Sequence, residues 1–173
     1  MKILTQLLLT AAMMCLCSSC LFKEPVFADG FAKTDPGLPG VWVSEEEKGD
    51  PRKLEFAVVA PIDDTRLVLH HPSGEKGGLY YEARQLGVRG RTVLQLRVLA
   101  TFSDGIPKPD AERYTLLWLE KADDGKKLRI RAMGGDGVKD KSPVDVRKFL
   151  EDPAADWNDA FGEVVIFRRL EDR

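Results

Sequence analysis

Residues 113–133, RYTLLWLEKADDGKKLRIRAM, hold two apolar runs joined by a turn sequence, and this pattern decides the fold class. In the second run, Leu128, Ile130 and Ala132 alternate with lysine and arginine, which predicts a β-strand with one buried and one wet face. Between the runs, Gly125 supplies the positive-φ position that a short hairpin needs. The stretch therefore predicts two antiparallel strands, because so short a connection cannot make a parallel crossover.

The first of these runs is apolar on both faces over residues 116–119, so its outer side needs a cover. The best candidate is a helix after Ser142, which is followed by proline and can cap the first turn. A second short helix is expected to begin at Asp152 and to carry Trp157 and Phe161 on one face. Both helices lie before the last predicted strand.

Six further runs rich in Val, Leu, Phe, Tyr and Trp are separated by Gly, Pro and Asp clusters, which is typical of strands. The eight predicted strands span residues 41–44, 53–60, 65–71, 79–88, 92–102, 113–121, 127–133 and 163–170. They predict a mainly β fold, an antiparallel eight-stranded up-and-down barrel with a short helical segment before the last strand, because closure removes exposed edges. A two-sheet sandwich is the alternative.

The length and composition fit a single soluble globular domain. The chain has 173 residues, of which 43% are hydrophobic and 31% charged. Its 26 basic residues are outnumbered by 28 acidic ones, which gives a net charge of -2. Nucleic acid is therefore not expected as a partner, because no basic excess is present to neutralise a phosphate backbone.

The N-terminus has the layout of a secretory signal. Lys2 precedes a largely apolar run over residues 3–16. As a helix this run reaches roughly 21 Å, short of the roughly 30 Å hydrocarbon core of a membrane, so we expect it to be removed rather than retained. The three cysteines, Cys15, Cys17 and Cys20, all lie at its end, so no disulfide is expected within the mature domain.

Residues 16–20, LCSSC, resemble the lipobox of bacterial lipoproteins, in which small residues precede a cysteine that is acylated and becomes the mature N-terminus. The resemblance implies a signal peptide over residues 1–19, lipid on Cys20 and anchoring in the bacterial cell envelope. Leu21 after that cysteine implies the outer membrane, on its periplasmic or its surface side. The alternative is a soluble secreted protein cut after Ala28.

Residues 20–39 contain several prolines and glycines and little periodicity, which predicts a lipidated irregular tether. The barrel domain is then expected over residues 40–173. Gly40 and Trp42 in its first strand resemble the Gly-x-Trp motif of the lipocalin or calycin superfamily. Arg168 or Arg169 in the last strand resembles the arginine that packs over that tryptophan. The chain departs from the family in placing its helix before the last strand rather than after it.

Nothing in the sequence forms a convincing catalytic or metal-binding pattern. His70 and His71 are adjacent on a strand, so their side chains point to opposite faces and cannot easily share one metal. The glycine cluster at residues 134–137 lacks the helix that opens directly behind a phosphate-binding loop. No serine lies in a nucleophile elbow. We therefore expect a protein that is not an enzyme and needs no metal or cofactor.

Aromatic residues suggest a binding role instead. Tyr81, Tyr114 and Trp118, with Tyr80 and Phe102, are candidates to line an apolar cavity inside the barrel. The first functional hypothesis is therefore a membrane-anchored envelope lipoprotein that binds a small apolar or amphipathic ligand. The alternative is a non-catalytic structural or assembly lipoprotein, whose barrel is filled by its own side chains and which docks an envelope protein.

Overall fold

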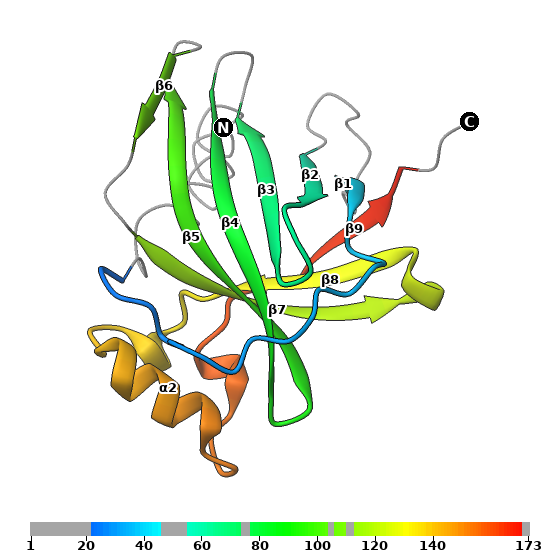
Figure 1. Ribbon diagram of the computed structural model, residues 1–173. Helices are drawn as coiled ribbons and strands as arrows, with labels where there is room; N and C mark the ends of the chain where they lie inside the picture. Colours follow the sequence, from blue (N-terminus) through cyan, green and yellow to red (C-terminus); the bar gives the residue numbers. More distant parts are fainter. Residues whose placement is uncertain (1–21, 46–54, 74–76, 104–105, 110–112, 171–173) are drawn as a thin grey trace, which may run out of the picture.

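The computed structural model describes residues 22–45, 55–73, 77–103, 106–109 and 113–170 (Figure 1). The strands are β1 (Gly40–Ser44), β2 (Phe56–Pro61), β3 (Arg66–Ser73), β4 (Gly77–Val88), β5 (Arg91–Ser103), β6 (Ile106–Pro109), β7 (Tyr114–Ala122), β8 (Lys127–Ala132) and β9 (Val165–Arg169). The helical elements are α2 (Pro143–Glu151) and the 3-10 turns η2 (Asp123–Gly125), η3 (Asp136–Val138) and η4 (Trp157–Asp159).

Eight of these strands form a closed antiparallel barrel in the order β1-β2-β3-β4-β5-β7-β8-β9. The first and last strands close the ring, with Trp42 opposite Arg169 and Ser44 opposite Phe167. The predicted up-and-down barrel is confirmed, and the sandwich is excluded, because every strand of the ring has a neighbour on both sides. The helix α2 precedes the last strand, as predicted.

The ninth strand, β6, lies outside the ring and was not predicted. It pairs with the end of β5, where Ile106 faces Ser103 and Pro109 faces Ala100. Two of its four residues are prolines, which cannot donate to a ladder and are confined to edge strands. The same prolines hide the strand from a reading of the sequence, because proline within a run argues against a strand.

The barrel wall separates two hydrophobic clusters. The inner cluster fills the barrel and consists of Leu38, Trp42, Ala57, Leu67, Ala83, Leu94, Leu96, Leu119, Leu128 and Phe167. The outer cluster lies between the wall and α2 and consists of Val26, Phe27, Leu86, Val88, Val93, Leu116, Trp118, Met133, Val138, Val146, Leu150, Trp157, Ala160 and Phe161. The strand β7 contributes to both clusters, which confirms that its outer side needs a cover and that the helical region supplies it.

Of the two predicted helices that cover β7, the structure confirms the first. Ser142 caps α2 as expected, and its Oγ accepts a hydrogen bond from the Asp145 amide at 3.2 Å. The second helix is only the single 3-10 turn η4, and its cap is Asp156 rather than Asp152. Trp157 still contacts Phe161, with ring centroids 5.4 Å apart, so the buried face was predicted although the helix was not.

The β2–β3 connection is a tight turn, and hydrogen bonds to Asp63 hold it. Its Oδ1 accepts hydrogen bonds from the amides of Thr65 and Arg66, each at 2.9 Å. The Arg66 side chain also donates to Oδ2 at 2.7 Å. These hydrogen bonds lower the pKa of Asp63 to about 2, because they favour the charged carboxylate.

Residues 22–39 differ from the expected tether. Their backbone is irregular, yet Val26 and Phe27 belong to the outer cluster and Leu38 to the inner one. All three side chains are buried, with exposed fractions of 4%, 4% and 2%. The folded domain therefore includes residues before Gly40, because this segment covers one wall and one end of the barrel. Cys20 and the expected signal peptide lie outside the described residues.

Candidate functional site

One end of the barrel is closed around Trp42. Its ring is 1% exposed, and its Nε1 donates a hydrogen bond to the Leu38 carbonyl at 2.8 Å. The guanidinium of Arg169 lies over the ring, with Cζ 5.9 Å from the centroid, and donates to the Pro39 carbonyl at 2.8 Å. Residues 38 and 39 are thereby fixed across this end, which closes it.

The arginine at this end is Arg169, whereas the sequence analysis offered Arg168 or Arg169. Arg168 pairs with Val43 and Lys127 and lies on the opposite face of β9, because successive strand residues alternate. Gly40 has φ +147°, and a Cβ there would lie 3.2 Å from Arg169 Nε, so the glycine leaves room for the guanidinium.

The interior of the barrel is filled. The cavity among its apolar side chains measures only about 30 Å³. Its lining is apolar and includes Trp42, Leu67, Leu94 and Phe167. A ligand of the size that lipid-binding barrels carry does not fit there without displacing side chains.

The three predicted ligand-binding residues do not line one cavity. Tyr81 packs against the inner cluster. Trp118 belongs to the outer cluster, and Tyr114 lies on the same face of β7 by strand alternation. Their grouping failed because residues 116–119 are apolar on both faces, so alternation alone did not decide which face is inside.

A crevice of about 290 Å³ lies at the closed end, between the 22–39 segment, the β4–β5 hairpin and β7. Arg91 lies there with its guanidinium 4.8 Å from the ring of Trp118 and 4.7 Å from that of Trp157. Lys121 forms an ion pair with Asp35 in the same crevice. Glu120 also lines it, so its acidic and basic side chains balance and favour no charged ligand class.

Asp35 stays ionised in this crevice. Burial raises the pKa of its carboxyl, but the hydrogen bonds from Lys121 and from the Gly37 amide outweigh that effect and hold the pKa below its usual range. The pair therefore fixes the 22–39 segment to β7. Sequence reasoning missed this contact, because the two residues are far apart in the chain and neither belongs to a recognisable motif.

A cluster of charges lies on the outer wall around Glu82. Its carboxylate lies within 3.0 Å of Arg97, 3.1 Å of Arg84 and 3.8 Å of Arg66. Arg84 and Arg97 therefore lie on the outer face of the wall. The arrangement neutralises a mostly buried carboxylate, so its simplest role is to hold three neighbouring strands together.

The histidines lie on opposite faces, as predicted. His70 stacks on Tyr80 with ring centroids 4.1 Å apart, whereas His71 lies 3.6 Å from the Glu55 carboxylate. Burial, and then the neighbouring His71, lower the pKa of His70. Within the described part of the chain, no three histidine, cysteine, aspartate or glutamate side chains are grouped closely enough to hold a metal ion.

The glycine cluster at residues 134–137 has a packing role. The amides of Gly134 and Gly135 donate to the Ala160 carbonyl at 3.1 and 3.0 Å. A Cβ at Gly135 would collide with the backbone of Asp159, so only glycine permits this approach. The cluster thus joins the end of β8 to η4.

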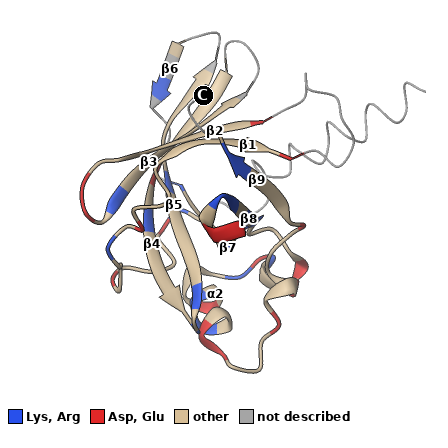
Figure 2. Cartoon of the chain, turned by 90° about the vertical axis from the view of Figure 1, so that its right-hand side faces the viewer, with Lys and Arg blue, Asp and Glu red and all other residues tan. Residues whose placement is uncertain are grey.

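Charges are mixed over the face that includes β9 and α2. Figure 2 shows basic and acidic residues interspersed there rather than gathered into one patch.

In the described ranges, no helix is both long enough and apolar enough to span a membrane.

No known protein family, no curated protein and no solved structure matches the chain. The closed eight-stranded antiparallel barrel is consistent with a lipocalin-like fold. That consistency rests on the number, order and antiparallel pairing of the strands.

Proposed function

We propose that this protein is a non-enzymatic lipoprotein of the bacterial cell envelope, anchored in the outer membrane by lipid on Cys20, that works through the outer surface of a filled barrel. The lipobox-like residues 16–20 support the anchor. The filled interior supports the second part and carries the proposal. Its natural partner is an envelope protein that docks on that surface.

The small volume of the interior supports the filled-barrel hypothesis over the carrier hypothesis. Pockets for small molecules usually measure about 300–1,000 Å³. The interior offers about 30 Å³, roughly a tenth of the lower bound. A carrier of apolar ligands would need either a larger cavity or a barrel that repacks, so the filled-barrel alternative is favoured.

Native mass spectrometry of residues 20–173, purified gently from an envelope extract, tests the filled barrel. We expect the mass of the chain with its covalent lipid and no further adduct that denaturation releases. A dye that fluoresces in apolar sites should also gain no intensity when it is mixed with a protein that lacks the acyl chains on Cys20. A discrete apolar adduct would contradict the filled barrel and favour the carrier.

The anchor is tested by replacing one cysteine at a time. Cys20→Ala should abolish the acylated mass and move the protein out of the membrane fraction. Cys17→Ala is the matched control and should remain acylated, because Cys17 would be removed with the signal peptide. Acylation that persists in Cys20→Ala would refute the anchor.

A further inference from the structure

Phe22 occupies a fixed point on the barrel wall. It exchanges two backbone hydrogen bonds with Tyr114, each 2.8 Å long, as an isolated antiparallel bridge. Five residues later, the side chain of Gln95 binds both backbone groups of Phe27, at 2.8 and 2.9 Å. Because Val26 and Phe27 are also buried, the folded domain sets the position at which the chain reaches residue 22.

The distance from this point to the proposed lipid is short. Cys20 stands two residues before Phe22, and an extended chain spans at most about 3.6 Å per residue, so their Cα atoms lie no more than about 7 Å apart. A flexible tether over residues 20–39 would have an r.m.s. span of about 25 Å. The packing of residues 22–39 thus removes most of the expected freedom between lipid and domain.

We infer that the anchor seats the barrel directly on the lipid bilayer, with the wall around Phe22 and the β5–β6 hairpin against the membrane. This inference rests on the proposed acylation of Cys20. The acyl chains on Cys20 lie in the leaflet, and Phe22 lies within about 7 Å of Cys20. This distance leaves no room between the domain and the bilayer for a water layer that would let the domain tumble freely.

The β5–β6 hairpin has the surface that such a contact needs. Tyr114 faces Arg97 on β5, and Ile106 faces Ser103 six residues further along, which places it roughly 20 Å from the anchor point. Ile106 is 62% exposed and Leu99 is 37% exposed. Exposed apolar side chains within this distance of a lipid anchor are stabilised when the bilayer removes them from water.

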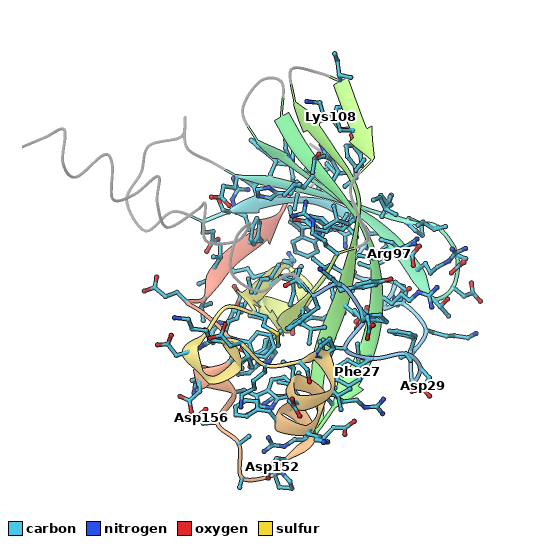
Figure 3. All side chains as sticks on the ribbon, turned by 90° about the vertical axis from the view of Figure 1, so that its left-hand side faces the viewer. Phe27, Asp29, Arg97, Lys108, Asp152 and Asp156 are labelled. Atoms are coloured by element: carbon cyan, nitrogen blue, oxygen red, sulfur yellow. The ribbon has the colours of Figure 1, made fainter. Side chains whose placement is uncertain are left out.

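Two exposed lysines frame this wall, Lys23 beside Phe22 and Lys108 on β6. Figure 3 looks onto this side of the molecule, where Arg97 lies between Lys108 above and Phe27 below. Lysine side chains can lie along an apolar surface and keep the ammonium at the level of the headgroups. The hairpin and the anchor point can therefore contact one bilayer plane together.

The test attaches the lipid chemically. In residues 20–173, which hold every residue of the two hydrophobic clusters, Cys20 is the only cysteine. A maleimide phospholipid therefore couples at one position, and the product is inserted into phosphatidylcholine vesicles with brominated acyl chains. The Ile106→Trp variant reports contact with these chains, because bromine quenches tryptophan fluorescence at short range.

Leu170→Trp is the matched control. Leu170 is 48% exposed and follows β9, on the other side of the barrel from β6 (Figure 1). The native tryptophans are buried, and the unsubstituted protein gives their background. We expect quenching of Ile106→Trp well above that background and none for Leu170→Trp. Equal quenching of the two variants, or none in either, would overturn the inference.

A second variant tests whether the short anchor causes the contact. Insertion of about 12 glycine and serine residues between Cys20 and Phe22 adds an r.m.s. span of about 20 Å and should abolish the difference between Ile106→Trp and Leu170→Trp. An unchanged difference would contradict the role of the anchor. Because the lipid is attached chemically, a protein that cells do not acylate would refute the proposed function and leave this result unaffected.

Discussion

Trp42 joins three parts of the molecule through one side chain. Its ring belongs to the inner cluster, its Nε1 donates to the Leu38 carbonyl, and Arg169 lies over the ring while donating to the Pro39 carbonyl. Each contact alone is modest, but together they fix the end of the 22–39 segment to the first and last strands. These few residues therefore close this end of the barrel.

We expect Trp42→Ala to lower the free energy of unfolding by about 3–5 kcal/mol, because it leaves a large cavity in a buried cluster. Arg169→Ala should cost about 1 kcal/mol, since a hydrogen bond and a cation–π contact are lost near the surface. Arg168→Ala is the matched control and should change little. Urea unfolding measures all three variants, and an equal loss for both arginine variants would contradict the assigned roles.

At the scale of single residues, the sequence identified Trp42 but not which of Arg168 and Arg169 lies over its ring. The last strand has apolar residues on both faces, Val164 and Ile166 on one and Val165 and Phe167 on the other. Alternation therefore could not decide which arginine points inward. The same ambiguity misplaced Trp118, whose side chain lies outside the barrel.

Among the elements, the 22–39 segment was the hardest to predict from the sequence. It has no periodicity, because its backbone is held by a bridge, by side chains and by single hydrogen bonds to the barrel rather than by a regular ladder. The barrel strands were predictable because one face is wet and the other buried. The short β6 strand was not, because its prolines suit only an edge.

Gln95 gives a direct test of how this segment is held. Gln95→Leu keeps the approximate shape but leaves the buried N–H and C=O of Phe27 without partners, which should cost roughly 2–5 kcal/mol. Trypsin should then cut faster after Lys23 and Lys33, which are exposed in the same segment. Limited proteolysis followed by mass spectrometry measures the rates.

Gln85→Leu is the comparison for that experiment. The side chain of Gln85 accepts one hydrogen bond, from the Asp35 amide at 3.1 Å, in a less buried place than Gln95. Its loss should raise the rate of cleavage after Lys33 only slightly. A Gln95→Leu protein that trypsin cuts at the rate of the unsubstituted chain would show that the hydrophobic contacts alone hold the segment.

At the scale of the whole molecule, the number and the antiparallel order of the strands predicted a closed barrel. They did not predict whether its interior is filled. Whether an eight-stranded barrel is filled or open depends on side-chain size at each inward position. The inward faces were uncertain on β7 and β9, so the volume could not be predicted. The two clusters on the two sides of the wall are a property of the folded molecule, and they make the 22–39 segment part of the core.

This shared core leads to a prediction about the limits of the domain. A chain that begins at Gly40, the boundary that the sequence favours, loses Val26, Phe27 and Leu38, which are all buried. At about 1.5–3 kcal/mol for each large buried side chain, the loss is roughly 5–9 kcal/mol as an upper estimate. Domains of this size are stable by only about 5–15 kcal/mol, so most of the margin disappears.

We therefore expect residues 40–173 to lack a sharp thermal transition and to give poorly dispersed amide signals in NMR spectra, whereas residues 22–173 should unfold cooperatively. The outer cluster explains the difference, because without Val26 and Phe27 its remaining residues face water on one side. If the shorter chain instead melts cooperatively within a few degrees of the longer one, residues 22–39 are an attachment to a barrel that folds alone. The distinction matters for the anchor, because only a segment that is part of the core can hold the barrel wall at a fixed distance from the lipid.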